Sequence, residues 1–500
     1  MNNTFSPPRN PNSSSLLLTD ELLLDYKRCD RRAFLNRYGD PQQRDPEREF
    51  VGKLKAENQR QIQELLKQYN WTGPEAPSRD WPQRIAQTIQ LMNAGVECIY
   101  RGLLSHQTPP TKTLPSLTLV GHPTLLVKQP YPSQLGEWSY IPVNVKLGKR
   151  PKTEYKVVAA FHGYLLQQIQ GFCPLTPELR LRGGKRYTVD LGMWLPPMEE
   201  VLQSCGSMLQ SWQEPDVFIS RQRCGLCDWQ TYCHGIAQQK NHLSLVPGIT
   251  PSRYEALQAL GIETPEELAE SEMLPDAELI EGELFAQLQQ QAQSISENRP
   301  LFRYPNKRLP PFPSAPIELY FDLEAEPDRQ VDYLFGVLCV NHETQEEQFY
   351  RFLAERPEDE PLVWQQFLAL IWRYPQAPIF HFSEYEVETV KRLTKLYRCT
   401  YFSLSSLVSR FVDIHHWIVT STTLPVENYS LKTLAKWLGF AWRDQAVSGD
   451  QTVCLYDKWL KVGDRSLLDT IIRYNEDDCR ATYHLKTWLE DFLQNSVEED

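Results

Sequence analysis

Ile317-Glu-Leu-Tyr-Phe-Asp-Leu-Glu324 is a mostly apolar stretch that ends in two carboxylates, Asp322 and Glu324. We expect it to form a buried strand, on which side chains two residues apart leave from the same face. Two acids on one face repel each other unless a neighbour neutralises them, and a pair of divalent cations is a common functional solution. Solvated acids at an exposed strand end are the simpler alternative for this stretch alone.

Further acids occur downstream in an order that would complete a metal site. A short apolar strand is predicted at 377–382, and the helix that follows it carries Glu386 in its first turn. A later helix is predicted to begin at Tyr474 and to continue to about Leu493. Tyr474 and Asp478 are four residues apart and therefore share one face of that helix. The four carboxylates predict a two-metal site, with the tyrosine able to orient a water.

This ordered set of residues resembles the DEDD-type 3′–5′ exonucleases of the ribonuclease H-like superfamily. The first family motif falls on Asp322 and Glu324, the second on 381–386, and the third on Tyr474 and Asp478. The resemblance implies a ribonuclease H-like α/β domain that hydrolyses DNA or RNA by a two-metal mechanism. The metal ligands that it implies for two Mg²⁺ or Mn²⁺ ions are Asp322, Glu324, Glu386 and Asp478, and it assigns Tyr474 to the attacking water.

The second motif departs from the family pattern. Its acid is Glu386, at a position where aspartate is usual in the family. A longer carboxylate can still reach a metal ion, but Asp413, in the strand-like stretch Phe411-Val-Asp-Ile414, is a substitute candidate. The sequence leaves this choice open, together with the alternative that the domain is an inactive relative of the same fold.

Composition and charge limit the remaining classes of protein. The chain has 500 residues, of which 41% are hydrophobic and 11% aromatic, and this length predicts a globular protein of about three domains. A net charge of −12 argues against a generally basic protein that coats nucleic acid. Residues 1–15 are polar and predict a disordered tail rather than a signal peptide, and no apolar run is long enough to span a membrane. We therefore expect a cytoplasmic protein with no membrane partner.

The N-terminal half contains two predicted strands, at 118–128 and 138–146, followed by a helix. This order is similar to the core of PD-(D/E)xK nucleases, in which an acid on the first strand and an acid two residues before a lysine hold one metal ion. The lysine is present as Lys146, but Thr124 and Asn144 occupy the two acid positions. Neutral side chains bind Mg²⁺ poorly. We therefore expect this site to be inactive.

Three cysteines lie close together in Cys224-Gly-Leu-Cys227-Asp-Trp-Gln-Thr-Tyr-Cys233. Three thiolates are one short of a tetrahedral metal site. The fourth ligand could be His234, His242 or a distant cysteine.

A cysteine near the N-terminus, followed much later by C-x2-C-x5-C, resembles the iron–sulfur staple of RecB-like nucleases. The resemblance covers 16–241 and implies a RecB-like restriction-endonuclease fold. The ligands of the implied 4Fe–4S cluster are Cys29, Cys224, Cys227 and Cys233, and structural Zn²⁺ is the alternative occupant. The family's Gln-x-x-x-Tyr helix motif is absent, because Val158 and His162 occupy its positions. The resemblance therefore carries the fold and the cluster ligands, but not catalysis.

A helical segment and a proline-rich stretch separate the two halves. Two short helices around Gly261-Ile262 resemble a helix-hairpin-helix unit, whose turn can present backbone N–H groups to phosphate. A helical linker between domains is the alternative. The predicted domains are a tail at 1–15, a RecB-like domain at 16–241, a helix-hairpin-helix-like segment at 242–299, a proline-rich linker at 300–316 and a ribonuclease H-like domain at 317–496. This order resembles a bacterial family of RecB-like nucleases.

The expected function is a metal-dependent 3′–5′ exonuclease that acts on DNA or RNA through its C-terminal domain. A catalytically inactive nucleic-acid-binding or assembly protein is the alternative from another class. A third alternative keeps nuclease activity in the N-terminal domain and needs acids from elsewhere, such as Glu57 or Glu137.

Overall fold

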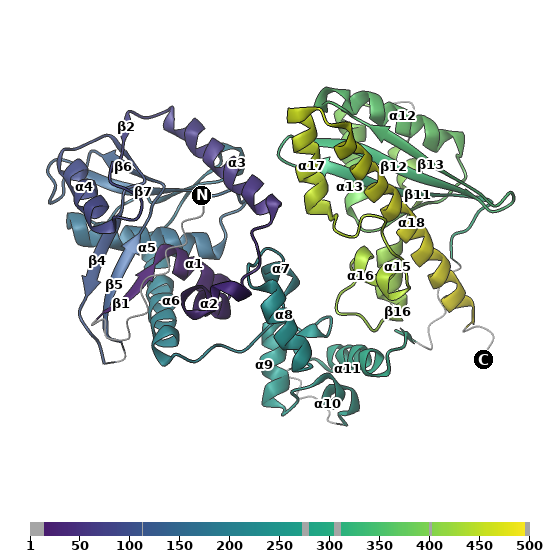
Figure 1. Ribbon diagram of the computed structural model, residues 1–500, viewed down its shortest axis with the longest axis horizontal. Helices are drawn as coiled ribbons and strands as arrows, with labels where there is room; N and C mark the ends of the chain where they lie inside the picture. Colours follow the sequence, from purple (N-terminus) through teal and green to yellow (C-terminus); the bar gives the residue numbers. More distant parts are fainter. Residues whose placement is uncertain (1–14, 113, 273–279, 305–311, 400–402, 496–500) are drawn as a thin grey trace. The chain divides into compact units, whose positions relative to one another are not determined.

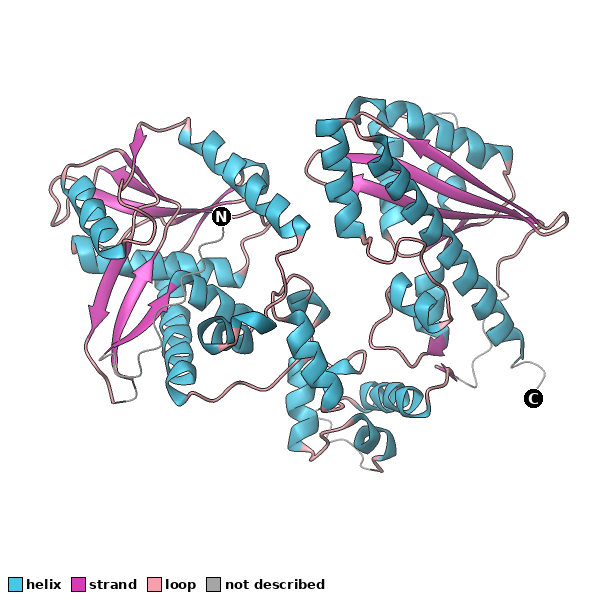
Figure 2. Cartoon of the chain, viewed as in Figure 1, coloured by secondary structure: helices cyan, strands magenta, loops and turns pink. Residues whose placement is uncertain are grey.

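The computed structural model describes residues 15–112, 114–272, 280–304, 312–399 and 403–495. The chain divides into two compact units, Met1–Ile236 and Ala237–Asp500. Each unit combines helices with β-strands (Figure 2), so the chain is an α/β multidomain protein. Among the described helices, none is long and apolar enough to cross a membrane.

The first unit contains a six-stranded sheet of order β2-β3-β6-β7-β8-β9 and a three-stranded sheet of order β1-β5-β4 (Figure 1). Its strands are β1 (Ser15–Thr19), β2 (Trp71–Thr72), β3 (Cys98–Tyr100), β4 (Leu104–Thr108), β5 (Ser116–Gly121), β6 (Leu125–Gln129), β7 (Ser139–Val145), β8 (Glu178–Arg180) and β9 (Arg186–Thr188). Its helices are α1 (Asp20–Arg28), α2 (Asp30–Tyr38), α3 (Glu49–Leu66), α4 (Trp81–Asn93), α5 (Thr153–Gln170), α6 (Leu191–Ser211) and α7 (Arg221–Cys224), and α8 (Gln230–Gln239) runs across the boundary to the second unit. Helix α5 is buried along most of its length and contacts α1, α6 and β7, so it forms the centre of this unit's core.

Residues 118–128 were expected to form one strand, and this prediction was wrong. The structure has two strands there, because β5 ends at Gly121 and β6 begins at Leu125. Pro123 lies between them and has no N–H group for a ladder hydrogen bond. Gly121 also packs tightly on α5, since a Cβ atom there would lie 2.7 Å from Cδ1 of Leu165.

The second unit is built around a five-stranded sheet of order β13-β12-β11-β14-β15. Its strands are β10 (Leu301–Phe302), β11 (Ile317–Glu326), β12 (Val331–Asn341), β13 (Glu346–Leu353), β14 (Ile379–His381), β15 (Phe411–Asp413) and β16 (Thr422–Thr423). Its helices are α9 (Pro251–Ala259), α10 (Pro265–Glu270), α11 (Gly282–Glu297), α12 (Glu360–Arg373), α13 (Tyr385–Leu396), α14 (Leu404–Val408), α15 (Ile414–Ser421), α16 (Leu431–Trp437), α17 (Gly449–Val462) and α18 (Arg465–Asn495). Part of the proline-rich stretch, 305–311, lies outside the described residues.

The central strand β11 pairs antiparallel with β12 and parallel with β14. Its side chains alternate between two cores. Phe321 packs with Phe367 of α12, whereas Tyr320 packs in the core that includes Leu485 of α18. Because side chains on a strand repeat every two residues, Asp322 and Glu324 leave on the face that carries Tyr320 and α18.

Helix α18 begins earlier than the sequence pattern indicated, and the prediction that it opens at Tyr474 was wrong. It starts at Arg465, two residues after Gly463 ends α17 in a left-handed conformation with φ 69°. Asp464 accepts a hydrogen bond from the Ser466 N–H at 3.0 Å and so supports the first turn. Tyr474 and Asp478 therefore lie in the interior of a long helix rather than in its first turn.

Candidate functional site

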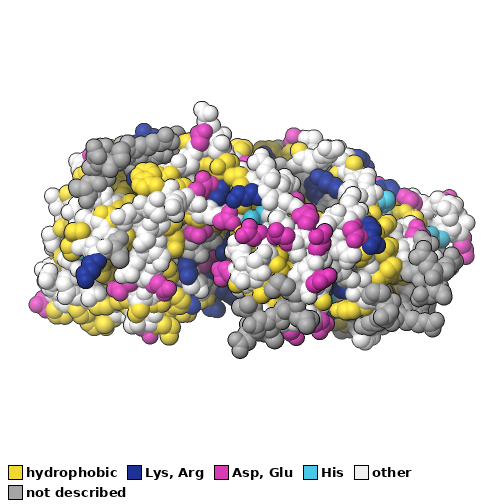
Figure 3. Space-filling view, turned by 90° about the horizontal axis from the view of Figure 1, so that it is seen from below, with side chains coloured by type: hydrophobic (Ala, Val, Ile, Leu, Met, Phe, Trp, Pro, Cys, Tyr) yellow, Lys and Arg dark blue, Asp and Glu magenta, His cyan; other side chains and the backbone are white. Residues whose placement is uncertain are grey.

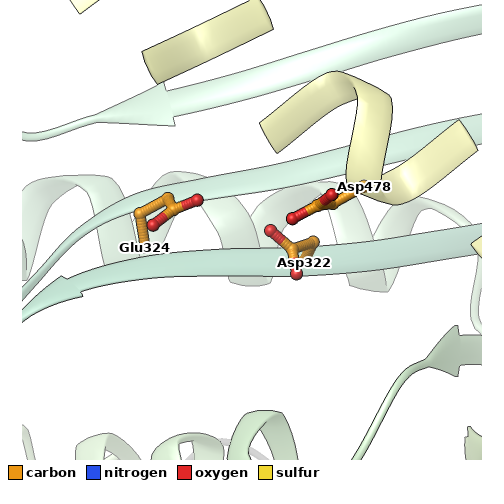
Figure 4. A group of neighbouring side chains, drawn as sticks. All are labelled: Asp322, Glu324 and Asp478. Atoms are coloured by element: carbon orange, nitrogen blue, oxygen red, sulfur yellow. The ribbon is translucent and has the colours of Figure 1, made fainter. Parts of the chain in front are cut away.

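Three carboxylates from two elements converge in the second unit. Asp322 and Glu324 come from β11, and Asp478 comes from the face of α18 that covers this strand. One oxygen of each lies within 4.8 Å of an oxygen of the others, and this is the only group of potential metal ligands at such spacing among the described residues. Figure 4 shows Asp322 and Asp478 turned toward each other, with Glu324 farther along the strand.

A neutral hydrogen-bond donor holds each carboxylate. Asn475 Nδ2 donates to Asp322 Oδ2 at 2.6 Å. Two further donors are the Thr452 hydroxyl, 2.7 Å from Glu324 Oε2, and Trp442 Nε1, 2.7 Å from Asp478 Oδ1. None of these donors carries a charge that cancels that of its carboxylate. The three acids are therefore oriented by their neighbours but remain available for a cation.

The three acids are harder to ionise than ordinary carboxylates. Burial, followed by the charges of Asp478, Glu324 and Glu386, raises the pKa of Asp322 well above its ordinary value. Burial likewise raises the pKa of Glu324 and of Asp478, although hydrogen bonds from Thr452 and Trp442 partly oppose the shift. A divalent cation would relieve both the repulsion and the loss of hydration. The donor set, which consists of carboxylate oxygens, fits Mg²⁺ or Mn²⁺.

Gly336 makes room for the donor to Asp322. It lies on β12 directly opposite Asp322, and a Cβ atom at this position would stand 1.7 Å from Asn475 Oδ1. The ladder of β11 and β12 also shifts its register between Glu324 and Ala325, immediately after the second acid. Such irregularities are frequent beside active sites because they redirect side chains.

Sequence reasoning missed the residues that orient the acids. Asn475 stands next to the predicted Tyr474, but nothing in the sequence distinguishes it from any other polar residue of an amphipathic helix. Thr452 and Trp442 lie on α17 and in the segment before it, and only the packing of these segments against β11 and α18 brings them to the site. Gly336 belongs to no sequence motif either.

The two candidates for the fourth acid make different contacts. Glu386 is buried in the first turn of α13, accepts a hydrogen bond from the Ser383 hydroxyl at 3.3 Å, and contributes to the raised pKa of Asp322. Asp413 instead accepts the N–H groups of Ser383 at 3.1 Å and of His416 at 3.2 Å, so it caps α15. Ser383 has φ 113°, a strained conformation for a residue other than glycine, at the entrance to α13. Neither acid belongs to the group at 4.8 Å spacing, but Glu386 is the one whose charge reaches it.

Tyr474 lies beside the acids on α18. Its side chain is buried, and burial raises the pKa of its hydroxyl, with further contributions from the charges of Asp478, Glu324 and Asp322 and from hydrogen bonding to Asp478. The phenol is therefore neutral across the physiological range. It can donate its proton to an oxygen near Asp478, which is the chemistry needed to orient a water.

The positions of the predicted degenerate site in the first unit also lie near one another. Asn144 is buried on β7, and its Nδ2 atom has no hydrogen-bond partner among the described residues. The Thr124 hydroxyl accepts the Val145 N–H at 3.1 Å, and Lys146 lies beside the Tyr155 ring. Within the described part of this unit, no group of His, Cys, Asp and Glu side chains has metal-binding spacing. Glu137, one of the acids considered as a replacement, is exposed just before β7.

An aspartate between two histidines occupies this region instead. Asp20 at the start of α1 lies 3.0 Å from Nδ1 of His122 and 2.9 Å from Nε2 of His162. Burial raises the pKa of Asp20, but the hydrogen bonds and charges of the two histidines outweigh it, and the resulting pKa is well below its ordinary value. His162 lies on α5 together with Val158, so this cluster joins α1 to α5 and to the turn after β5.

The segments that carry the four predicted cluster cysteines are tied together. The N–H of Asp45 donates to the Asp228 carbonyl at 2.7 Å, Trp229 Nε1 donates to Asn36 at 2.7 Å, and Arg48 donates to the Gly225 carbonyl at 2.7 Å. Burial is the main cause that raises the pKa of Cys29, to about 11, and the nearby thiols of Cys224 and Cys227 add to it. The described residues nevertheless show no cysteine cluster closed to within 4.8 Å.

The predicted helix-hairpin-helix turn uses its own backbone donors. The Glu267 carboxylate accepts the N–H groups of Glu263 at 2.7 Å and Thr264 at 3.0 Å and so caps α10. Arg253 donates to the Gly248 carbonyl at 2.5 Å. Helix α11, which follows, packs against the same unit through Gln291, whose Nε2 donates to the Leu424 carbonyl at 2.7 Å.

Comparison with known proteins identifies the C-terminal part of the chain. A family model described as the RNase_H superfamily matches residues 319–490, from β11 into α18. This match includes Asp322, Glu324 and Asp478 and confirms the expected ribonuclease H-like domain. A comparison with curated proteins found no match.

Proposed function

We propose that this chain is a metal-dependent nuclease that hydrolyses phosphodiesters of DNA or RNA as a 3′–5′ exonuclease, through its RNase H superfamily domain. The observation that carries the proposal is the convergence of Asp322, Glu324 and Asp478 within 4.8 Å of one another. The RNase H superfamily match supports a nucleic-acid substrate. The polarity of cleavage rests on the resemblance of the three motifs to DEDD-type exonucleases.

The proposed ligands of two Mg²⁺ or Mn²⁺ ions are Asp322, Glu324, Glu386 and Asp478. Bound ions would activate a water for attack and stabilise the leaving 3′ oxygen. Asn475, Thr452 and Trp442 would fix the orientation of three of the carboxylates. Tyr474 would donate a hydrogen bond to the attacking water and hold it in line. Glu386 would add the fourth negative charge, on the side of the site where Asp322 lies.

The surface charge agrees with a local rather than a general nucleic-acid site. The net charge is −12, and on the face shown in Figure 3 basic side chains are interspersed with acidic and apolar ones rather than gathered into one broad band. A substrate strand would then be held mainly at the catalytic site, which is consistent with an enzyme and less so with a protein that coats nucleic acid.

Single-stranded DNA and RNA oligonucleotides, labelled at either end and incubated with Mn²⁺, would test the reaction and its polarity. We expect a 5′-labelled strand to shorten through a ladder of products and a 3′-labelled strand to release its label at once. Asp478→Asn is expected to lose this activity. Binding without cleavage by the native protein would leave the inactive nucleic-acid-binding alternative.

We also propose that 16–241 is a RecB-like domain whose nuclease site is lost and whose cysteines Cys29, Cys224, Cys227 and Cys233 hold a 4Fe–4S cluster. The hydrogen bonds between the two cysteine-bearing segments support a shared site. Iron and sulfide analysis with visible absorption of anaerobically purified protein would test it, and zinc without iron would overturn it.

A further inference from the structure

Helix α16 packs against α18 (Figure 1), and its residue Lys432 lies close enough to Asp478 for their charges to interact. The ammonium nitrogen of Lys432 lies 5.5 Å from the ring centre of Trp442 and 5.5 Å from that of Tyr474. Trp442 holds Asp478 through a hydrogen bond of 2.7 Å, and Tyr474 lies one helical turn before Asp478. The Trp442 ring therefore contacts both the ammonium group and Asp478, which is a proposed metal ligand.

The charge of this lysine acts on the site. Burial lowers the pKa of Lys432, and the negative charge of Asp478 opposes that shift. The positive charge of Lys432 in turn lowers the pKa of Asp478. The side chain is only partly buried, so it can reach a molecule that enters from solvent. An ammonium group has three donors, and the described contacts use one of them, to the Val447 carbonyl at 2.6 Å.

A cation at this place is unfavourable for a site that only binds metal ions, because it repels them. It becomes favourable once the ions have neutralised the carboxylates and an anion must be held beside them. Four carboxylates and two divalent ions would balance in charge, and Lys432 would then supply the positive charge that a phosphodiester needs. The acids themselves cannot supply this positive charge.

We propose that Lys432 is a further catalytic residue, whose ammonium group contacts a non-bridging phosphate oxygen of the nucleic-acid strand bound at the acidic site. The proposal rests on the nuclease function proposed above. The two aromatic rings hold the ammonium in place, and the hydrogen bond to Val447 fixes the segment between α16 and α17. A purely structural lysine that only ties down this segment is the competing explanation.

Lys432→Met tests the proposal, because methionine keeps much of the length and apolar character of the side chain but removes the charge. Two quantities are measured: the affinity for Mn²⁺ alone, from the electron paramagnetic resonance signal of the free ion, and the rate of oligonucleotide cleavage. We expect Mn²⁺ affinity to be unchanged or a few-fold tighter, since a repelling charge is gone. Cleavage is expected to fall about 100-fold, as on removal of a charge-stabilising donor.

Two matched variants make the result specific. Lys432→Arg keeps the charge and is expected to recover much of the cleavage rate, although its planar group differs in shape. Lys436→Met removes an exposed lysine one turn later on the same helix and is expected to leave both quantities unchanged. A loss caused by general reduction of positive charge would appear in both lysine-to-methionine variants.

Three outcomes would overturn the proposal. Lys432→Met could cleave like the native chain, it could lose Mn²⁺ affinity together with cleavage, which indicates a structural role, or Lys432→Arg could fail to recover activity. If the native chain cleaves nothing, the nuclease function fails separately. Binding of a fluorescent single-stranded oligonucleotide with Mn²⁺ then decides the role of Lys432: weaker binding by Lys432→Met supports the phosphate contact, and equal binding refutes it.

Discussion

At the scale of single residues, the candidate site depends on tight packing around the side chains that hold its acids. Asp322 is held by Asn475, and Asn475 in turn fits against a glycine of the neighbouring strand. Metal sites are commonly tuned by such supporting residues, which are often as important as the ligands themselves.

Gly336→Ala is expected to weaken the metal site, because the added methyl group would meet Asn475 Oδ1 at 1.7 Å and displace the donor to Asp322. We expect a loss of about 1–3 kcal/mol in the free energy of unfolding and a fall in Mn²⁺ affinity of about 10-fold. Denaturation of the C-terminal unit and Mn²⁺ titration would measure both. Gly282→Ala on α11, where a Cβ atom meets none of the described residues within 4 Å, is the control and should lower neither stability nor Mn²⁺ affinity.

Asp322→Asn is expected to make the metal-free protein at least as heat-stable as the native chain at neutral pH. Burial and the neighbouring acids raise the pKa of Asp322 above its ordinary value of 3.8. Ionisation of Asp322 therefore lowers the free energy of unfolding as the pH rises above 3.8. Differential scanning fluorimetry with and without Mn²⁺ would measure this. The native protein should gain stability on adding Mn²⁺ by linkage, and Asp322→Asn should gain little.

Asp413→Asn serves as the matched comparison for this experiment. Asp413 caps α15, so its replacement should lower stability by about 1 kcal/mol or less but leave the rise with Mn²⁺ intact. Loss of the Mn²⁺ response in Asp413→Asn would contradict the assignment of Glu386, rather than Asp413, to the site.

At the scale of helices and strands, the most informative contact in the first unit joins three elements. Asp20 connects α1 to His162 of α5 and to His122 in the turn between β5 and β6. Glu21 and Lys146 lie close enough for their charges to influence the same cluster. A hydrogen-bonded cluster thus lies near the positions where a PD-(D/E)xK nuclease would hold its metal ion.

Asp20→Asn is expected to loosen this unit in a pH-dependent way. Asp20 has a lowered pKa, so the stability that its carboxylate contributes is fully present above pH 3.8 and is lost as the pH falls through its folded pKa. Burial lowers the pKa of His122, but Asp20 raises it, and the resulting pKa is above the ordinary value of 6.5. The stability that protonated His122 contributes is therefore complete below pH 6.5 and is lost as the pH rises through its folded pKa. The difference between native and variant protein should therefore be largest between pH 4 and 6.5.

Hydrogen exchange of the α1 and α5 amides would measure this difference, which we expect to reach about 1–3 kcal/mol. Exchange in α18, in the other unit, serves as the internal control. A difference that is the same at all pH values would show that Asp20 acts through packing and not through its charge.

The sequence predicts those features of the fold that local patterns determine. The alternation in 317–324 is enough to place Asp322 and Glu324 on one face of a strand, and the spacing of Tyr474 and Asp478 places them on one helix face. The start of α18 was placed too late, although the apolar positions of 465–473 have helical periodicity and are preceded by a helix-ending glycine, Gly463, and a capping aspartate, Asp464. The sequence also does not predict the roles of Asn475, Thr452 and Trp442, since these roles depend on which segments pack together.

At the scale of the whole molecule, the chain separates two kinds of site. The acidic site lies in Ala237–Asp500, and the proposed cysteine site lies in Met1–Ile236. Each unit has its own hydrophobic core. The two sites should therefore respond to different substitutions.

Cys29→Ser is expected to abolish bound iron and visible absorption without changing the Mn²⁺ affinity of the acidic site. Serine is a poor ligand for iron, and Cys29 bridges α1 and α2 in the first unit alone. Absorption spectroscopy and Mn²⁺ titration on the same sample would show this. Loss of both properties together would mean that the cysteine site supports the folding of the entire chain.

Catalysis by a metal site of Asp322, Glu324 and Asp478 is best tested by the Mn²⁺-dependent release of nucleotides from a single-stranded oligonucleotide, compared between the native chain and Asp322→Asn. Removal of a charged ligand from a two-metal site predicts a loss of at least about 100-fold in rate, with the variant still folded. Equal activity in the two proteins would contradict the account and place catalysis outside this site.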